Sequence, residues 1–182
     1  MSDLPMEWRP LSIDALGKEL GEFSNWVLCG GYSVARLTGQ DSRPHGDVDI
    51  GVFRSQLNDC LKVLGKERVF LCRHGKHQAW DRGEVPEAVH DIWIADQTGC
   101  YWVLQIMVFD DEGDRVIYRR DRRISWLKRH HAMEIDGIKV LNPLITFLFK
   151  ANKAQMEDKE VHDLMQLIAH AGSAPASGET GR

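Results

Sequence analysis

CGGYSVARLTGQDSRPHGDVDIGVFR, residues 29–54, is the stretch that decides how this chain folds. An apolar run at 26–29 predicts a short buried strand, which Gly30-Gly31 ends in a tight turn. Residues 33–37 can then form a helix that ends at Thr38-Gly39. From 47 to 53, polar or small residues alternate with apolar ones, which predicts a strand with one face on the core.

The rest of the chain supplies further helices and a hairpin. Hydrophobic spacing predicts helices over 10–24, 56–66, 144–153 and 157–170, the third capped by Asn142 with Pro143 at its first position. Apolar runs at 92–95 and 101–109 flank Asp96-Gln97-Thr98-Gly99, which predicts a β-hairpin, and a third strand is expected near 116–118 after an acidic turn at 110–114.

This order of elements predicts an α+β fold, a small mixed β-sheet with helices packed on it. We divide the chain into a core at 1–140, a C-terminal helical segment at 141–170 and a disordered tail at 171–182.

The composition indicates a soluble globular protein of one ordinary domain, with 182 residues, 43% of them hydrophobic and 27% charged. No apolar run approaches the ~20 residues that span a bilayer, and the first residues lack the pattern of a signal peptide. The four scattered cysteines predict reduced thiols. We therefore expect a cytoplasmic protein without membrane contact. Its net charge of −4 makes nucleic acid a less favoured partner, although a local basic patch can suffice.

Asp47 and Asp49 form a candidate metal site. They lie two positions apart on the predicted strand, so both side chains leave the same face. Carboxylates held this close repel one another, and a divalent cation removes the conflict; oxygen ligands of this kind suit Mg²⁺. Taken alone, the pair also fits two solvated aspartates at a strand end.

Gly30 and Gly31 form a candidate phosphate loop. Glycines let the backbone approach an anion, and the following helix presents free N–H groups and the positive end of its dipole. Ser33 can add a hydroxyl donor, although a diglycine after a strand is often only a turn. Combined with the aspartates, the loop predicts a site that holds a nucleoside triphosphate while an acceptor hydroxyl attacks its α-phosphate.

With these residues in place, 29–54 resembles the signature of the aminoglycoside and lincosamide nucleotidyltransferases, of the DNA polymerase β-like nucleotidyltransferase superfamily. The family pattern is a Gly-Gly turn, a short helix ending in Gly, then Arg, His and D-[IV]-D. The matching residues are, in order, Gly30, Gly31, Gly39, Arg43, His45, Asp47 and Asp49.

Residues 141–164 also resemble the closing helices of that family, which read aromatic-Lys-Ala-Lys and then K-D-x-x-D. The matches are Phe149-Lys150-Ala151-Asn152-Lys153 and Lys159-Glu160-Val161-His162-Asp163, with Glu160 in place of the usual Asp. The resemblance implies the polymerase β-like nucleotidyltransferase fold, ATP or another NTP as substrate, and Mg²⁺ as cofactor.

The resemblance also implies roles for three basic residues in nucleotide binding. Arg43 and His45 would contact phosphates or orient the aspartates, and a plain loop role is the alternative for His45. Lys150 would reach the triphosphate; a solvated helix lysine is the alternative.

Relatives carry a third acidic residue on a neighbouring strand, as metal ligand or general base, and Gln105 stands at the matching position. The expected hairpin register places Asp91 opposite Leu104 or Gln105. We therefore take Asp91 as the third catalytic and metal-binding carboxylate, beside Asp47 and Asp49. The alternative is that Asp91 caps the strand and the site works with two acids or not at all.

The function expected from these residues is transfer of a nucleoside monophosphate, AMP first, from NTP and Mg²⁺ to a hydroxyl of a small molecule such as an aminoglycoside-like antibiotic. A second reading makes tRNA or a protein the acceptor, as in toxin-like relatives, with the arginine run at 119–123 as the RNA contact; that run otherwise predicts a solvated strand end. A third reading, prompted by Gln105, is a non-catalytic nucleotide-binding module. The pairs His130-His131 and His74/His77 are predicted to lie on the surface.

Overall fold

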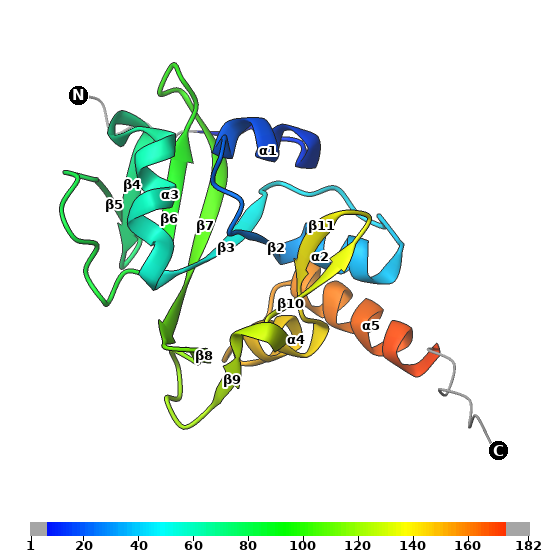
Figure 1. The fold of residues 1–182 in the computed structure, drawn as a ribbon. Coiled ribbons are helices and arrows are strands. Elements are labelled where there is room, and N and C mark those ends of the chain that lie inside the picture. The colour runs from blue at the N-terminus through cyan, green and yellow to red at the C-terminus, as the bar shows by residue number, and fades with distance from the viewer. Residues whose placement is uncertain (1–6, 174–182) are drawn as a thin grey trace.

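The computed structural model describes residues 7–173. Its strands form a mixed sheet, and helices pack on both sides of that sheet (Figure 1). The helices are α1 Ile13–Leu20, α2 Gly30–Thr38, α3 Leu57–Leu64, α4 Pro143–Ala151 and α5 Asp158–Ser173. The strands are β1 Glu7–Trp8, β2 Val27–Cys29, β3 Asp49–Phe53, β4 Val69–Arg73, β5 Lys76–Ala79, β6 Asp91–Ala95, β7 Tyr101–Glu112, β8 Arg115–Ile117, β9 Ser125–Leu127, β10 Ala132–Ile135 and β11 Ile138–Leu141.

The sheet has the order β10-β11-β2-β3-β7-β6-β4-β5. Strand β3 is antiparallel to β2 and parallel to β7, while β6 is antiparallel to both β7 and β4. Strand β1 pairs with β7 in parallel, and β8 extends from the far end of β7 to pair with β9. The α+β class with a mixed sheet is therefore confirmed.

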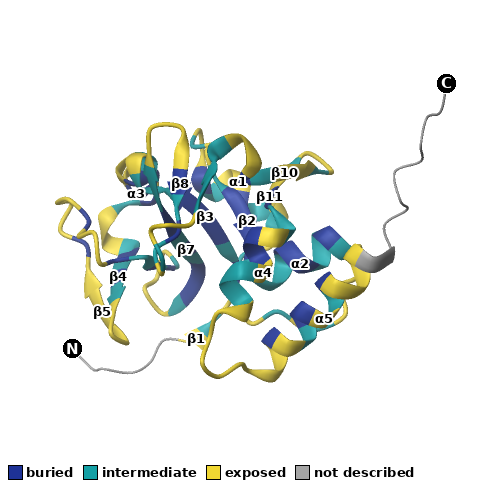
Figure 2. Ribbon diagram, turned by 90° about the horizontal axis from the view of Figure 1, so that it is seen from below, coloured by how far each residue is buried: buried dark blue, intermediate teal, exposed yellow. Residues whose placement is uncertain are grey.

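The two faces of the central strands differ in chemistry because side chains alternate along each strand. Ile50, Ile92 and Ile106 point to one face and are completely buried, together with leucines of α1 and α3. Figure 2 shows this burial along β2, β3 and β7, whereas β5 is exposed. The other face carries Asp49 and Gln105, which lie side by side in register. One face thus belongs to the main core. The opposite face is buried against Ile145 of α4 at Cys29 and Phe109, and it carries polar side chains at Asp49 and Gln105.

Helices α2, α4 and α5 pack against one another beside the glycine turn (Figure 1). Asn142 caps α4 as predicted, because its side chain accepts a hydrogen bond from the backbone N–H of Leu144 at 2.9 Å, and Pro143 is the first helical residue. This packing brings the last third of the chain against residues 30–38 and so to the site.

Several element boundaries differ from the prediction. Helix α2 begins at Gly30 rather than at 33, and β3 begins at Asp49 rather than at 47. The predicted acidic turn at 110–114 is largely part of β7, which continues to Glu112. Residues 171–173 belong to α5 and not to a tail. The expectations for 1–6 and 174–182 lie outside the described residues.

His131 is buried, which corrects the prediction of a surface histidine. It is 2% exposed, packs on the rings of Phe53 and Phe109, and accepts a hydrogen bond on Nδ1 from the indole N–H of Trp126 at 3.1 Å. Burial lowers its pKa to about 4, so the ring is neutral at physiological pH.

Within residues 7–173, no helix combines the length and apolarity needed to cross a bilayer.

Candidate active site

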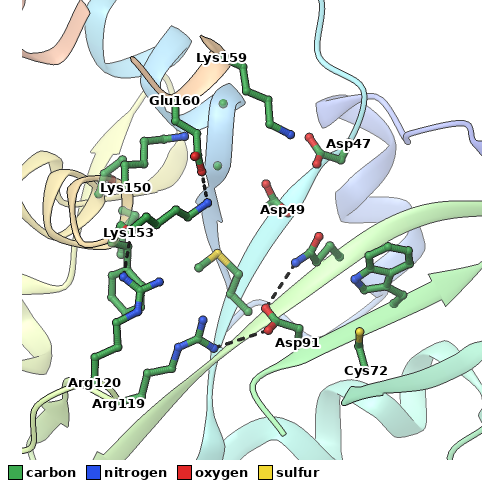
Figure 3. Close-up of a pocket in the computed structure, with 18 of the residues that line it drawn as sticks. Asp47, Asp49, Cys72, Asp91, Arg119, Arg120, Lys150, Lys153, Lys159 and Glu160 are labelled. Carbon is green, nitrogen blue, oxygen red and sulfur yellow. Dashed lines mark hydrogen bonds and ion pairs between the residues drawn. The ribbon is translucent and has the colours of Figure 1, made fainter. Parts of the chain in front are cut away.

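A pocket of about 410 Å³ opens where the polar face of the sheet meets α2, α4 and α5 (Figure 3). It brings together residues from both ends of the chain. The residues that line it are Gly30, Gly31, Arg43, Asp47, Asp49, Cys72, Asp91, Trp93, Gln105, Met107, Arg119, Arg120, Leu141, Thr146, Phe149, Lys150, Lys153, Lys159 and Glu160.

The side chains of Asp47 and Asp49 leave the same face of an extended segment and point into this pocket. The carbonyl of Val48 accepts a hydrogen bond from the N–H of Gln105 at 2.9 Å, so the backbone is already extended before β3 begins. Val48 is completely buried, and its two neighbours therefore point the opposite way. Figure 3 shows both carboxylates facing the same open space, with Lys159 extending toward them.

The surroundings of Asp49 disfavour its negative charge. Burial, and then the charge of Asp47, raise its pKa to about 7, although Lys150 and Lys159 act in the opposite direction. A dication between the two carboxylates would remove this penalty, and two hard oxygen donors with space for phosphate and water fit Mg²⁺. Within residues 7–173, no three His, Cys, Asp or Glu side chains are grouped closely enough to hold one ion together. The fit to magnesium therefore depends on the Asp47 and Asp49 pair.

The diglycine is required by close packing at the start of α2. Gly30 has a φ of +64°, and a Cβ there would overlap Oδ2 of Asp49 and lie 2.8 Å from its Cγ. A Cβ on Gly31 would overlap the guanidinium of Arg43 and lie 2.6 Å from Nδ1 of His45. The missing side chains thus let the carboxylate of Asp49 and the loop at 43–45 lie directly against the first turn of α2.

Ser33 and His45 lie behind the pocket surface. Ser33 is completely buried, and its hydroxyl donates to the carbonyl of Gly30 at 2.8 Å. The His45 ring packs on Tyr32 at 4.2 Å, and its Nε2 lies 3.1 Å from Asp41. These contacts shape the phosphate loop from behind, and direct contact of either side chain with phosphate stays a prediction.

Asp163 fixes two of the predicted phosphate-binding residues. This carboxylate is 2% exposed and accepts hydrogen bonds from Arg43 at 3.0 and 2.8 Å and from Nζ of Lys150 at 2.8 Å. These bonds depress its pKa despite the opposing effect of burial. Lys153 is held in the same way by the buried Glu160. Asp163 is the last residue of the K-D-x-x-D match, a pattern that did not indicate this contact with Arg43 and Lys150.

Asp91 lines the same pocket, but the predicted register was wrong. It lies opposite Met107 for two reasons: the hairpin closes with the N–H of Asp96 on the carbonyl of Tyr101, so that Ala95 faces Trp102, and an irregularity between Ile94 and Ala95 shifts the pairing of β6 with β7 by one further residue. Its Oδ1 accepts a 3.4 Å hydrogen bond from the side-chain amide of Gln105, its diagonal neighbour, and Arg119 lies 3.7 Å from its Oδ2. Its role as third carboxylate stays a prediction.

The arginine run is divided by its contacts. Arg119 enters the pocket beside Asp91, and Arg120 donates to the carbonyls of Phe149 and Asn152 at the end of α4. Arg122 and Arg123 pair with Glu112 and Asp121 on the exposed surface. The solvated-surface prediction therefore holds for the end of the run and not for its start.

Solved structures resemble this fold, whereas the sequence comparisons give no match. No protein-family model matches the chain, and no curated protein resembles it in sequence. The crystal structure of the lincosamide antibiotic adenylyltransferase LnuA, lincomycin-bound, superimposes with a TM-score of 0.59 and 15% identity, covering 89% of this chain and 99% of that one. ANT(2")-Ia in complex with adenylyl-2"-tobramycin aligns with a TM-score of 0.46 and 13% identity, over 81% and 79% of the two chains. The likeness to LnuA confirms the expected nucleotidyltransferase fold.

Replacing Gly30 by Ala should destabilise the protein more than replacing Gly39 by Ala. Both glycines have positive φ, 64° and 68°, so each alanine costs roughly 1–2 kcal/mol in backbone strain. A Cβ at Gly39 meets nothing within 4 Å, whereas one at Gly30 must displace Asp49, at a further cost of about 1–3 kcal/mol. Urea unfolding of both variants measures the difference, and equal losses would contradict the packing described here.

Replacing Asp49 by Asn should stabilise the metal-free protein at high pH only. The folded-state pKa of about 7 lies above the ordinary 3.8, so the stability present below pH 4 is lost as pH rises through 7. Asparagine carries no charge, so relative to wild type the variant should gain roughly 2–4 kcal/mol between pH 4 and pH 8. Urea unfolding in EDTA measures this, with the exposed Asp59→Asn as control. A difference that does not change with pH would refute the raised pKa.

Proposed function

We propose that this protein is a nucleotidyltransferase that moves a nucleoside monophosphate, AMP in the first instance, from NTP and Mg²⁺ to a hydroxyl of a small molecule, for example an antibiotic. One observation carries the proposal: Asp47 and Asp49 point into a single pocket directly against the side-chain-free turn Gly30-Gly31. The fold shared with a lincosamide adenylyltransferase supports the same chemistry.

The helix side of the pocket suits a triphosphate. It is lined by Arg43, Lys150, Lys153 and Lys159. Before any ligand binds, buried Asp163 holds Arg43 and Lys150, and buried Glu160 holds Lys153. Charges fixed in this way need no reorganisation when an anion binds. The N-terminal turn of α2 adds backbone N–H groups and the positive end of its dipole.

Asp47 and Asp49 would hold the magnesium ion. When bound, the ion neutralises charge on the phosphate oxygens and orients the triphosphate. The raised pKa of Asp49 favours this role, because the carboxylate gains most from a cation where its own charge is poorly solvated.

In the proposed reaction, the acceptor oxygen forms a bond to the α-phosphorus while the bond from phosphorus to the pyrophosphate oxygen breaks. Pyrophosphate leaves with the bonding electrons. Asp91 accepts the hydroxyl proton, since it is the carboxylate of the sheet side and is half-exposed to the pocket. Gln105 and Arg119 orient Asp91 through the contacts described above.

A nucleotide-binding module without transfer is the alternative that Gln105 favours, because an amide replaces the carboxylate of the active relatives at the position in register with Asp49. Binding of ATP without release of pyrophosphate, across many acceptors, would identify this module.

Wild-type protein should release pyrophosphate from ATP in the presence of Mg²⁺ and a hydroxylated acceptor, with label from α-³²P ATP moving to that acceptor. Asp47→Asn and Asp49→Asn should each lower the rate by at least about 100-fold, since each removes a ligand worth several kcal/mol. Asp59→Asn, on the outer face of α3, should retain the rate. Full activity in either site variant would sink the proposal.

Asp91→Asn tests the base separately. We expect kcat to fall by roughly 10²–10⁴-fold while the KM for ATP changes little, because a general base acts on the acceptor and not on the triphosphate. Steady-state kinetics with varied ATP give both numbers, and near-normal kcat would remove Asp91 from the mechanism.

A further inference from the structure

The sheet side of the pocket, where Asp91 lies, carries side chains that can select the acceptor. Register places its residues in two adjacent rows on one face of the sheet: Asp49, Gln105 and Trp93 in the first, and Met107, Asp91 and Cys72 in the second. The lysines that suit a triphosphate come from α4, from α5 and, for Lys153, from the segment between them, on the other side of Asp49 (Figure 3). The aspartate pair therefore lies between a cationic half and a sheet half.

The geometry of in-line displacement indicates which half of the pocket takes the pyrophosphate and which takes the acceptor. The nucleophile must approach phosphorus from the side opposite the leaving pyrophosphate. Because Lys150 and Lys153 favour pyrophosphate on the helix side, the acceptor has to arrive from the sheet side, where Asp91 lies. This assignment depends on the proposed function.

Trp93 is the large apolar side chain of that half, and its neighbours hold it in place. Its ring contacts those of Trp8 at 5.0 Å, His77 at 4.4 Å and Trp102 at 5.4 Å. Trp93 itself is half-buried and lines the pocket. A ring fixed from several sides loses little freedom on binding, so it forms a preorganised surface for an apolar face.

The charges of the sheet half exclude a polycation. Among the described residues that line the pocket, the acidic ones are Asp47, Asp49, Asp91 and Glu160. The first two are assigned to magnesium, Glu160 is paired with Lys153, and Asp91 lies beside Arg119. An acceptor with several ammonium groups would find no free carboxylate there and would meet Arg119.

We propose that Trp93 forms the floor of an acceptor subsite, and that the acceptor is a hydroxylated small molecule with an apolar face, such as the C–H face of a saturated ring, and at most one positive charge. Polyamine acceptors of the aminoglycoside type are thereby disfavoured.

The test compares two probes, lincomycin with its single basic amine and tobramycin with several, by saturation-transfer NMR titration in 150 mM salt. Proteins are wild type, Trp93→Leu, which keeps an apolar residue on the strand, Trp93→Phe, which keeps a ring, and Trp26→Ala, a half-buried tryptophan outside this pocket. Melting curves confirm that each variant is folded, and ATP binding is titrated in parallel.

We expect lincomycin to bind at least about 10-fold more tightly than tobramycin, Trp93→Leu to weaken lincomycin by about 10-fold, and Trp93→Phe and Trp26→Ala to stay within about 3-fold of wild type. The subsite is overturned if tobramycin binds better, if neither probe binds, or if Trp93→Leu weakens ATP instead of lincomycin. If lincomycin binds at Trp93 but no pyrophosphate is released, the subsite is supported and the transferase proposal is contradicted. If nucleotide transfer occurs and Trp93→Leu does not affect it, the transferase proposal is supported and the subsite is contradicted.

Discussion

Burial of the Asp49 carboxylate beside the charge of Asp47 is the constraint on which the rest of this site depends. The two carboxylates share one side of an extended segment, and Asp49 lies directly against Gly30, which has no side chain. A protein gains no stability from such an arrangement, since burial raises the pKa of Asp49 to about 7. Groups that destabilise a fold in this way are concentrated at functional sites, where a ligand relieves the conflict.

The cationic side of the pocket is built on the opposite principle, because its charges are paired before ligand binding. Asp163 joins the loop at 43 to α4, and Glu160 holds Lys153, so that α5 fixes the side chains that we propose bind phosphate. If Asp163 moved away with α5, the charges of Arg43 and Lys150 would lose their buried partner. The position of α5 is therefore coupled to the positions of these two side chains. The apolar face of the sheet, packed under α1 and α3, supplies the rigid base on which both halves rest.

The site was predictable from sequence where its geometry is local. The spacing of Asp47 and Asp49, the diglycine before a helix, and the Asn142-Pro143 cap depend on neighbouring residues alone, and each lies where the pattern indicated. The sequence indicated no place in the pocket for Arg119 or Trp93, and no role for Asp163 behind Arg43 and Lys150, because these positions arise only through tertiary packing. The predicted partner of Asp91 was wrong because the hairpin closes at Asp96 and Tyr101 and because Val103 is an extra residue of β7, which shifts the register once more. His131 was misplaced because nothing adjacent to it signals the aromatic cluster that buries it. The strands β10 and β11 join the sheet through β2, far away in sequence, which no local pattern reveals.

The most direct measurement is a crystal structure of the protein with Mn²⁺ and a non-hydrolysable ATP analogue. If Asp47 and Asp49 hold the metal, an anomalous manganese peak should lie within ligand distance of both, with the triphosphate lying over Gly30-Gly31 and reaching Lys150. Manganese bound elsewhere, or a triphosphate seated away from the diglycine, would contradict the claim that these aspartates and this turn form one site.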